Sequence, residues 1–459
     1  MIDAIIISIY LLLVLSIGIY NRNRNQNLEH YSHIGNDINS NKFILTATIF
    51  ASAVGGGTCF GITEKAFSQN LAFTYGLLLT IPVDLAIAKF LVPRMTQYNN
   101  VNSTGEIIGK YYGKYARIIT GISSTLISIG YLAVQISVTG RIFSFLFTID
   151  FLYAVILSYA VVIIYTTVGG FRSVVINNSL QFFAMVMAIP IITVFGIKYI
   201  GLANFIQNIP AEKYDILSNN SLFFDTIFTT LSFSVMGFAP SFIQRILIGT
   251  RPEPIKHAIY FKTAIYAIFI ICLSLNGLIA MEIFPHLNPI YSVTSIIDFL
   301  IPSGLKALVI IGLLAATMST ADSDLNISAI SIVNDIFLPL NIRYKEKKLL
   351  LLTKCVSILV GISVVLVALK FQTIVELVMF SAGFWAPIAL VPLIGILFNK
   401  IISKTGFYAC TSSGALTFII TSLTRENQAV SAIFLGTAAS LICFLIFYKF
   451  KPKIQHYRT

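Results

Sequence analysis

The sequence predicts an all-α polytopic membrane protein. Of its 459 residues, 56% are hydrophobic and only 11% are charged, and the mean hydropathy is +0.85. A soluble globular protein has about 25% charged residues, so a water-facing fold of this size would lack a polar surface. Apolar runs of about 20 residues, the length that crosses a bilayer as a helix, recur from one end of the chain to the other.

We expect about thirteen transmembrane helices. They are predicted near residues 2–20, 43–67, 74–93, 115–147, 150–168, 173–197, 223–246, 258–283, 305–335, 348–369, 371–398, 404–423 and 429–448. The first run lacks a basic leader and a small-residue cleavage site, which favours a retained helix over a signal peptide. The polar stretches between the spans are short, which favours a single transmembrane domain over residues 1–459.

The distribution of charge predicts the orientation. A net charge of +12 could indicate a nucleic-acid partner, but most of the 31 Lys and Arg residues fall in or near the loops that follow the odd-numbered spans, Arg245 and Lys262 among them. Cytoplasmic loops are enriched in basic residues. We therefore expect the N-terminus outside, the C-terminus in the cytoplasm, and the lipid bilayer rather than nucleic acid as the partner.

The second span contains the sequence ASAVGGGT, from Ala51 to Thr58. Each of the three glycines costs about 1 kcal/mol relative to alanine in a helix. If the helix unwinds there, the carbonyls of Ala51 to Val54 lose their amide partners and become suitable ligands for a hard cation such as Na⁺. Close helix packing through small residues is the alternative. Unwinding is favoured because packing motifs usually space their glycines.

The seventh span carries a second break, at the sequence GFAP from Gly237 to Pro240. Pro240 has no amide hydrogen to donate, which predicts a kink or an unwound turn. Broken helices in corresponding positions of two halves indicate a transport site near the middle of the membrane in an inverted-repeat fold.

The ninth span carries the sequence AATMSTADS, from Ala315 to Ser323. On a helix, Ala316, Ser319, Thr320 and Ser323 share one face and present a carbonyl and three hydroxyls together. This stripe fits an ion site, although hydrogen bonding between helices is also common for Ser and Thr. Asp322 in the same span is either a structural acid or part of an ion path.

With these motifs the chain resembles the sodium:solute symporter family, most closely its branch of high-affinity choline transporters. The similarity runs over residues 43–400 and rests on four segments: Tyr165–Val174 (YTTVGGFRSV) followed by Gln181, Ala315–Ser323, Thr48–Gly57, and Gln244–Arg245. The resemblance implies a LeuT-type core of two inverted five-helix repeats, here residues 43–197 and 223–398. Residues 2–20 would then be an extra N-terminal helix, and residues 404–448 two C-terminal helices.

The resemblance also implies a sodium site. The family binds Na⁺ with carbonyls of the first core helix and with a carbonyl and hydroxyls of the eighth. Carried over by motif, the ligands are Ala51, Val54, Ala316, Ser319 and Thr320.

Two departures from the family pattern are informative. Members that use a second sodium ion have an Asp where this chain has Asn178, after Asn177, which predicts one Na⁺ per cycle. The choline branch surrounds its cation with tryptophans, whereas the corresponding positions here are Ala53, Tyr131 and Ala239. The one tryptophan of the chain is Trp385, so choline is not expected to be the substrate.

We therefore expect a sodium-coupled secondary active symporter that imports a small organic solute by alternating access. The solute is predicted to bind beside Gly56, Gly57 and Thr58, facing Tyr131, Gln135, Phe238 and Phe242. No counter-charge is evident at the centre of this set, which favours an amino acid such as proline, or another small zwitterionic or neutral polar nutrient. The expected location is a bacterial inner (plasma) membrane, without an obligatory protein partner.

Three other functions would share features of this sequence with a sodium-coupled symporter. A solute receptor or sensor would share the fold, but no appended signalling domain is evident, and a proton-coupled carrier would differ only in its ion. A membrane enzyme would need a catalytic set such as Asp84, Arg141, Asp322 and Glu376. These residues lie on different spans without nucleophile–base spacing, so catalysis is not expected.

Overall fold

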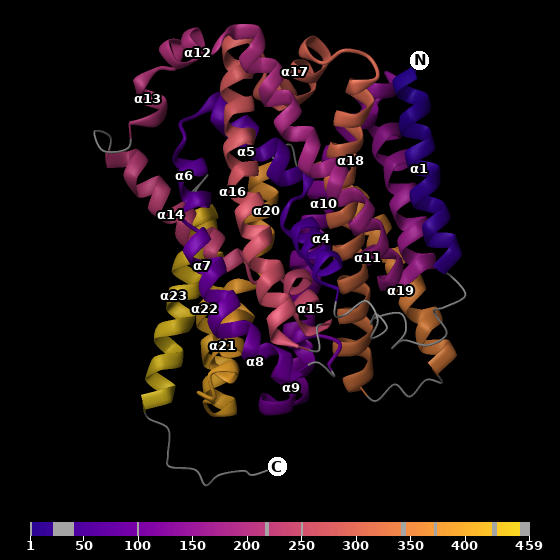
Figure 1. Cartoon of the computed structure of the whole chain (residues 1–459). Helices are drawn as coiled ribbons and strands as arrows, with labels where there is room; N and C mark the ends of the chain where they lie inside the picture. Colours follow the sequence, from indigo (N-terminus) through magenta and orange to yellow (C-terminus); the bar gives the residue numbers. More distant parts are fainter. Residues whose placement is uncertain are drawn as a thin grey trace.

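The computed structural model describes residues 2–21, 41–98, 101–215, 220–248, 251–340, 346–370, 374–424 and 429–449. Within these ranges the chain is helical and contains no strand. The helices form one elongated bundle in which most of them run between its two ends (Figure 1). The first residues of α1 lie at one end of the bundle and the last residues of α23 at the other, as an odd number of crossings requires (Figure 1).

The helices and their bounds are α1 (Ile2–Tyr20), α4 (Lys42–Ala53), α5 (Gly56–Ser68), α6 (Ala72–Leu78), α7 (Ile81–Ala86), α8 (Val92–Met95), α9 (Thr104–Tyr112), α10 (Lys114–Phe147), α11 (Phe151–Ile200), α12 (Leu202–Asn208), α13 (Ala211–Tyr214), α14 (Asn220–Met236), α15 (Pro240–Ile248), α16 (Pro252–Ile283), α17 (Ser292–Leu300), α18 (Leu305–Ile330), α19 (Glu346–Lys370), α20 (Ile374–Ala382), α21 (Val391–Leu397), α22 (Lys404–Thr424) and α23 (Ala429–Lys449). Short π-helical segments, Ile87–Leu91, Ser331–Phe337 and Ala386–Leu390, connect α7 to α8, extend α18 and precede α21.

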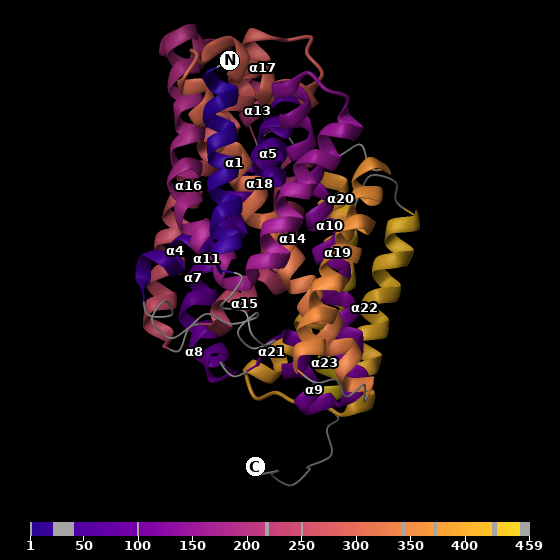
Figure 2. The ribbon, with the colours of Figure 1, turned by 90° about the vertical axis from the view of Figure 1, so that its right-hand side faces the viewer.

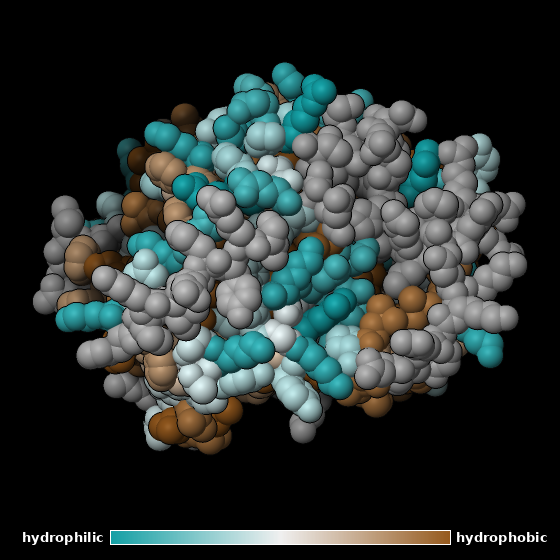
Figure 3. Space-filling view, turned by 90° about the horizontal axis from the view of Figure 1, so that it is seen from below, coloured by the Kyte–Doolittle hydropathy of each residue, from teal (hydrophilic) through white to brown (hydrophobic). Residues whose placement is uncertain are grey.

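The surface of the bundle suits a bilayer. Large apolar side chains are exposed along its sides, for example Leu12 of α1 (63% exposed) and Leu366 of α19 (67% exposed). Viewed from the lower end of the bundle, hydrophilic residues gather over the described part of that face (Figure 3). Apolar flanks with a polar end are expected of a protein whose helices cross a membrane and whose ends meet water.

The described residues include ten helices that are long and apolar enough to cross a membrane, or up to twelve when each of two bent pairs is counted as one span. Helix α11 has 50 residues, about 75 Å of helix, which is more than twice the hydrocarbon thickness of about 30 Å. It is divided at Gly170, whose φ of 60° and ψ of −169° are not helical. The two portions correspond to the predicted spans 150–168 and 173–197. The count of thirteen and the orientation stay predictions.

Both predicted helix breaks are confirmed. Helices α4 and α5 meet at an angle of 51° around Val54 and Gly55, and α14 and α15 meet at 45° just before Pro240. Each pair contains enough apolar residues to cross the membrane as one broken span. The breaks place the ends of four half-helices inside the bundle, where backbone groups need partners from protein rather than lipid.

Helix α18 runs through the interior of the bundle, with α10 and α11 packed against it (Figures 1 and 2). From Val309 to Ile330 every residue is buried. A Cβ on Gly312 would lie 2.2 Å from the Cβ of Ala188 in α11, so glycine permits the close approach of these two helices. The hydroxyls and carboxylates of α18 therefore face protein and not lipid.

Two basic residues that were counted with the cytoplasmic loops, although they fall within the predicted spans 223–246 and 258–283, are buried inside helices. Arg245 of α15 is fully buried, and Lys262 of α16 is 4% exposed. Their charges are compensated internally, because Arg245 donates to the carbonyls of Thr48 (3.0 Å) and Ser241 (2.6 Å) and Lys262 pairs with Asp84. The positions of Arg245 and Lys262 in the sequence do not reveal their partners Thr48 and Asp84, because those two residues lie on other helices.

A lysine of the segment after α11 caps α5, the second half of the first broken span. The ammonium of Lys213 in α13 donates to the carbonyls of Phe67 (2.7 Å), Ala66 (3.2 Å) and Gln69 at the C-terminal end of α5. Partial burial lowers the pKa of Lys213. A cation at a helix C-terminus compensates the partial negative charge of the last carbonyls, so this contact fixes α5 to the loop.

We predict that Lys213→Met, which keeps the aliphatic stem but removes the charge, lowers the apparent Tm of the purified protein. Hydrogen bonds to a charged group contribute about 1.5–3 kcal/mol, so the loss should exceed that of a surface lysine. Lys198→Met, at an exposed position of α11, is the matched control. Equal Tm values for the two variants, measured by thermal unfolding in detergent, would contradict the cap.

Candidate functional site

The candidate site is built around the break between α4 and α5. Val54 and Gly55 have extended backbone, with φ of −113° and −111°, so the helical hydrogen-bond ladder is interrupted there. Glycine is required here by close approach and not by backbone angle. A Cβ on Gly55 would lie 2.9 Å from Thr320 Oγ1, and one on Gly56 would lie 2.3 Å from Thr317 Cγ2. The glycines let α18 approach the break.

The structure brings the five sequence-predicted sodium ligands together. Thr320 Oγ1 lies 3.1 Å from the carbonyl oxygen of Ala51, 3.4 Å from that of Val54 and 3.2 Å from that of Ala316. Ser319 Oγ lies 3.4 Å from Ala51 O and 3.1 Å from Ala316 O. All five residues are buried. We call these five oxygens, of Ala51, Val54, Ala316, Ser319 and Thr320, the oxygen cluster.

The oxygen cluster has the chemistry of a hard-cation site. It consists of three carbonyls and two hydroxyls, which suit a hard cation such as Na⁺ and offer no nitrogen or sulfur ligand for a transition metal. Among the residues that the structure describes, no group of three His, Cys, Asp or Glu side chains is placed to hold a metal ion. The donor set therefore fits Na⁺.

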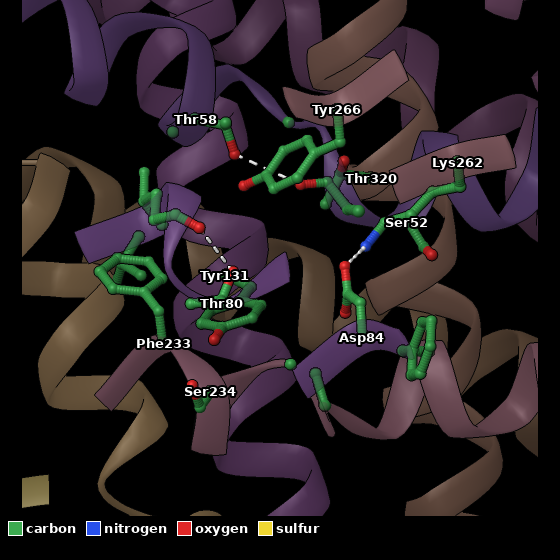
Figure 4. Close-up of a pocket in the computed structure, with 18 of the residues that line it drawn as sticks. Ser52, Thr58, Thr80, Asp84, Tyr131, Phe233, Ser234, Lys262, Tyr266 and Thr320 are labelled. Atoms are coloured by element: carbon green, nitrogen blue, oxygen red, sulfur yellow. Dashed lines mark hydrogen bonds and ion pairs between the residues drawn. The ribbon is translucent and has the colours of Figure 1, made fainter. Parts of the chain in front are cut away.

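A cavity of about 170 Å³ lies beside the oxygen cluster and is lined by residues of both broken spans and of α6, α7, α10 and α16 (Figure 4). Of the residues predicted to bind solute, five line this cavity: Gly57, Thr58, Tyr131, Gln135 and Phe242. Thr320 also lines it. One hydroxyl group therefore belongs both to the oxygen cluster and to the wall of the cavity.

The other two predicted solute residues lie behind the wall. The amide of Gly56 donates to Gln135 Oε1 (2.7 Å) and its α-carbon faces Val138 and Thr317. Phe238 is buried, and its carbonyl accepts a hydrogen bond from Trp385 Nε1 (2.9 Å). In this structure both residues hold the broken helices in place and do not line the cavity.

The positions at which the choline branch has tryptophans do line the cavity, since Ala53, Tyr131 and Ala239 are all part of its wall. Trp385 is fully buried and is not among the lining residues. The replacement of indole rings by alanine and tyrosine therefore falls on the solute cavity itself.

Sequence reasoning missed an ion pair in the cavity wall. Lys262 Nζ of α16 lies 2.7 Å from Asp84 Oδ2 of α7, and both residues line the cavity (Figure 4). The sequence indicated no counter-charge at the centre of the predicted solute residues, whereas the wall of the cavity that five of them line contains this ion pair. Asp84 lies in the predicted span 74–93 and Lys262 in the predicted span 258–283, and the sequence does not indicate that they meet. Helical spacing places Lys262 and Tyr266 on one face of α16, which is the signal that could have located Lys262.

Asp322, the acid singled out in the ninth predicted span, has structural partners. Tyr165 donates to Asp322 Oδ2 (3.1 Å), and Ser323 donates to Asp322 Oδ1 (3.1 Å). Asp322 is not among the cavity-lining residues. The cavity does not bring together the four residues of a catalytic set, because Asp84 lines it and Asp322 and Arg141 do not; the side chain of Glu376 is outside the described part of the chain.

Asn178, at the position of the carboxylate in two-sodium relatives, is fully buried and donates through Nδ2 to Thr48 Oγ1 of α4 (3.1 Å). The amide thus joins α11 to the first broken span. A carboxylate could not donate this hydrogen bond.

The chain matches the model of a known protein family and is similar to two characterised transporters. The model of the sodium:solute symporter family matches residues 38–416. The sodium/pantothenate symporter of Escherichia coli (strain K12) is 22% identical over 434 residues, covering 90% of this chain and 88% of that protein. The high-affinity proline transporter PutP of Bacillus subtilis (strain 168) is 24% identical over 449 residues and 94% of each chain. Neither relative is a choline transporter, so the choice of branch stays a prediction.

Solved structures of similar shape confirm the predicted LeuT-type fold. A Na⁺-coupled sialic acid symporter, in a substrate-bound outward-open state, superposes with a TM-score of 0.85 at 18% identity over 99% of both chains. MhsT in complex with L-phenylalanine gives a TM-score of 0.58 at 14% identity, over 89% of this chain and 97% of that one. At such identities the likeness concerns the fold alone. By its matching family model and its membrane-spanning helices, the chain belongs to the sodium:solute symporter family and is an integral protein of the plasma membrane.

Proposed function

We propose that this chain is a Na⁺-coupled symporter that imports a small polar organic solute, with one Na⁺ per cycle bound by the oxygen cluster. The observation that carries the proposal is the double position of Thr320, whose side chain is part of the oxygen cluster and of the solute cavity wall. An ion held there would fix the geometry of the wall that the solute contacts, and this is how binding of one would favour binding of the other.

The oxygen cluster joins two elements that have to move relative to each other. One of its carbonyls, that of Ala51, belongs to α4, a second, that of Val54, belongs to the break that follows, and the other three oxygens belong to α18. Na⁺ binding would tie the broken span to α18, and its different affinity for the outward-open and inward-open states would shift their populations. One Na⁺ crossing about 100 mV down a tenfold gradient releases about 3.7 kcal/mol, which supports roughly 500-fold accumulation of a neutral solute.

A single Na⁺ per cycle is supported by the chemistry at Asn178, which offers an amide and not a carboxylate and already donates to Thr48. The names of the relatives indicate that small polar nutrients, pantothenate and proline, are carried by this kind of protein. We assign the same broad class to this chain, as a transporter and not an enzyme. A proton-coupled carrier and a non-transporting sensor are the alternatives that the following experiments separate.

The first prediction concerns coupling. The purified protein, screened against a library of small polar solutes by thermal shift, should be stabilised by at least one solute in NaCl and not in equimolar KCl. At a ligand concentration of 100 Kd the stabilisation is about 2.7 kcal/mol. Equal stabilisation in both salts would contradict sodium coupling and favour a proton-coupled carrier. Na⁺-dependent binding without uptake into proteoliposomes would indicate a sensor.

The second prediction concerns the ion site. The double variant Ser319→Ala, Thr320→Val removes two oxygens with little change of volume, so the Na⁺ concentration for half-maximal stabilisation should rise about tenfold or more. Ser328→Ala is the matched control, because Ser328 is buried in the same helix but bonds the carbonyl of Leu325 in its own helix. An unchanged Na⁺ dependence in the double variant would refute the site.

A further inference from the structure

The cavity has one ion pair in its wall, between Asp84 of α7 and Lys262 of α16, and the proposed function does not use it. The side chains are 13% and 6% exposed, and the two charged atoms lie 2.7 Å apart. The other four ion pairs of the described residues involve side chains that do not line the cavity. A nearly buried pair is tolerated when both charges are present, whereas removing one leaves an uncompensated charge.

The pair has hydrogen-bonding capacity to spare. Lys262 and Thr263 both donate to the same oxygen, Asp84 Oδ2, at 2.7 and 3.2 Å. An ammonium has three protons, and a carboxylate has two oxygens that each accept more than one bond. The described contacts therefore leave ammonium protons of Lys262 and acceptor positions of Asp84 for a ligand. Lys262 Nζ is also 5.0 Å from the ring centre of Tyr266, another residue of the wall.

The cavity wall also contains groups of a different electrostatic character. Thr58, in the first turn of α5, and Thr320 of the oxygen cluster both line the cavity together with the Asp84–Lys262 pair (Figure 4). With Na⁺ bound, the region around Thr320 would be positive, and the N-terminal end of α5 adds to the same sign. A carboxylate is the group that such a region binds best, and an anion together with one Na⁺ adds no net charge to the buried site.

Charge balance then limits what can meet the ion pair. An ammonium on the solute near the ion pair would compete with Lys262 for Asp84. A second carboxylate there would compete with Asp84 for Lys262. Either would leave one charge of the buried site without a partner. An uncharged hydroxyl or amide group can accept a proton from Lys262 and donate one to Asp84 while the pair stays closed.

We propose that Asp84 and Lys262 form a specificity-determining pair that selects monocarboxylate solutes whose other end carries hydroxyl or amide groups. This inference rests on the proposed function, because it takes the cavity as the solute site and Na⁺ as the ion beside it. It differs from the expectation drawn from the sequence, which favoured an amino acid such as proline, or another small zwitterionic or neutral polar nutrient. The ion pair is the feature that changes the preferred class.

The test measures binding of three probes to the purified full-length protein in NaCl. Pantothenate has one carboxylate and a tail with an amide and two hydroxyls, L-proline has no polar tail, and glutarate has a second carboxylate. The wild-type protein should bind pantothenate about 10- to 100-fold more tightly than the other two, as expected for one or two hydrogen bonds to charged groups.

Two substitutions separate a role in specificity from a role in stability. Asp84→Asn leaves the ammonium of Lys262 without its counter-charge, so glutarate should gain affinity relative to pantothenate. Lys262→Met should weaken pantothenate binding about 10- to 100-fold without this gain. Lys256→Met is the matched control, because it removes an ion pair, with Glu253, from the start of the same helix and outside the cavity. A purely structural pair would lower stability without changing the ratio of glutarate affinity to pantothenate affinity.

Stabilisation by Na⁺ alone reports folding and the ion site in every variant, since the oxygen cluster contains neither Asp84 nor Lys262. Tighter binding of proline than of pantothenate by the wild-type protein overturns the inference, as does an unchanged ratio of glutarate affinity to pantothenate affinity in Asp84→Asn. Both results would leave the symporter proposal intact if binding still requires Na⁺. Binding that is equal in NaCl and KCl would instead count against the proposed function.

Discussion

A helix that breaks inside a membrane exposes carbonyl oxygens that lipid cannot satisfy, and much of this structure follows from that constraint. The break after Ala53 frees the carbonyls of the preceding turn, and they meet the hydroxyls of Ser319 and Thr320 at 3.1–3.4 Å. This contact requires α18 to lie against the break. It therefore requires glycine at positions 55 and 56, where a Cβ would collide with Thr320 and Thr317, and a helix α18 that is buried on all sides.

The second broken span is attached to the same place. Arg245 of α15 donates to the carbonyl of Thr48 in α4 (3.0 Å) and to the hydroxyl of Ser323 in α18. A buried guanidinium has five N–H donors and no acceptor, so it suits a position among carbonyls and hydroxyls. Both broken spans are thus joined to α18 by polar contacts inside an apolar bundle. When the bundle changes between two states, these hydrogen bonds can break and re-form together, because each donor has few acceptors within reach.

The polar groups of the site are divided by charge. The ion end has neutral oxygens, so a cation there brings the positive charge with it. The cavity wall also has a complete ion pair, 2.7 Å between its charged atoms, that is neutral as a whole. The same wall contains the aromatic side chains of Phe73, Tyr131, Phe233, Phe242 and Tyr266. A solute that fits this arrangement needs a carboxylate near the ion and uncharged polar groups near the pair.

The sequence by itself determined the class of protein, the two breaks and the composition of the oxygen cluster. These features are local: apolar length, three consecutive glycines, a proline and a helical stripe of hydroxyls each have meaning within a short window of chain. It also separated α11 into two spans, because Gly169 and Gly170 interrupt the apolar run there, and Gly170 is non-helical in the structure.

What only the tertiary structure decided are the contacts between residues far apart in the chain. Asp84 and Lys262 are 178 positions apart, and neither residue type nor spacing indicates that they pair. The same holds for the hydrogen bond from Arg245 to Thr48. Gly56 and Phe238 occur in the motifs of the broken helices but do not line the cavity. A motif fixes which residues are near the site, whereas the packing of neighbouring helices fixes which of them face it, because burial and charge compensation depend on partners that the local sequence does not contain.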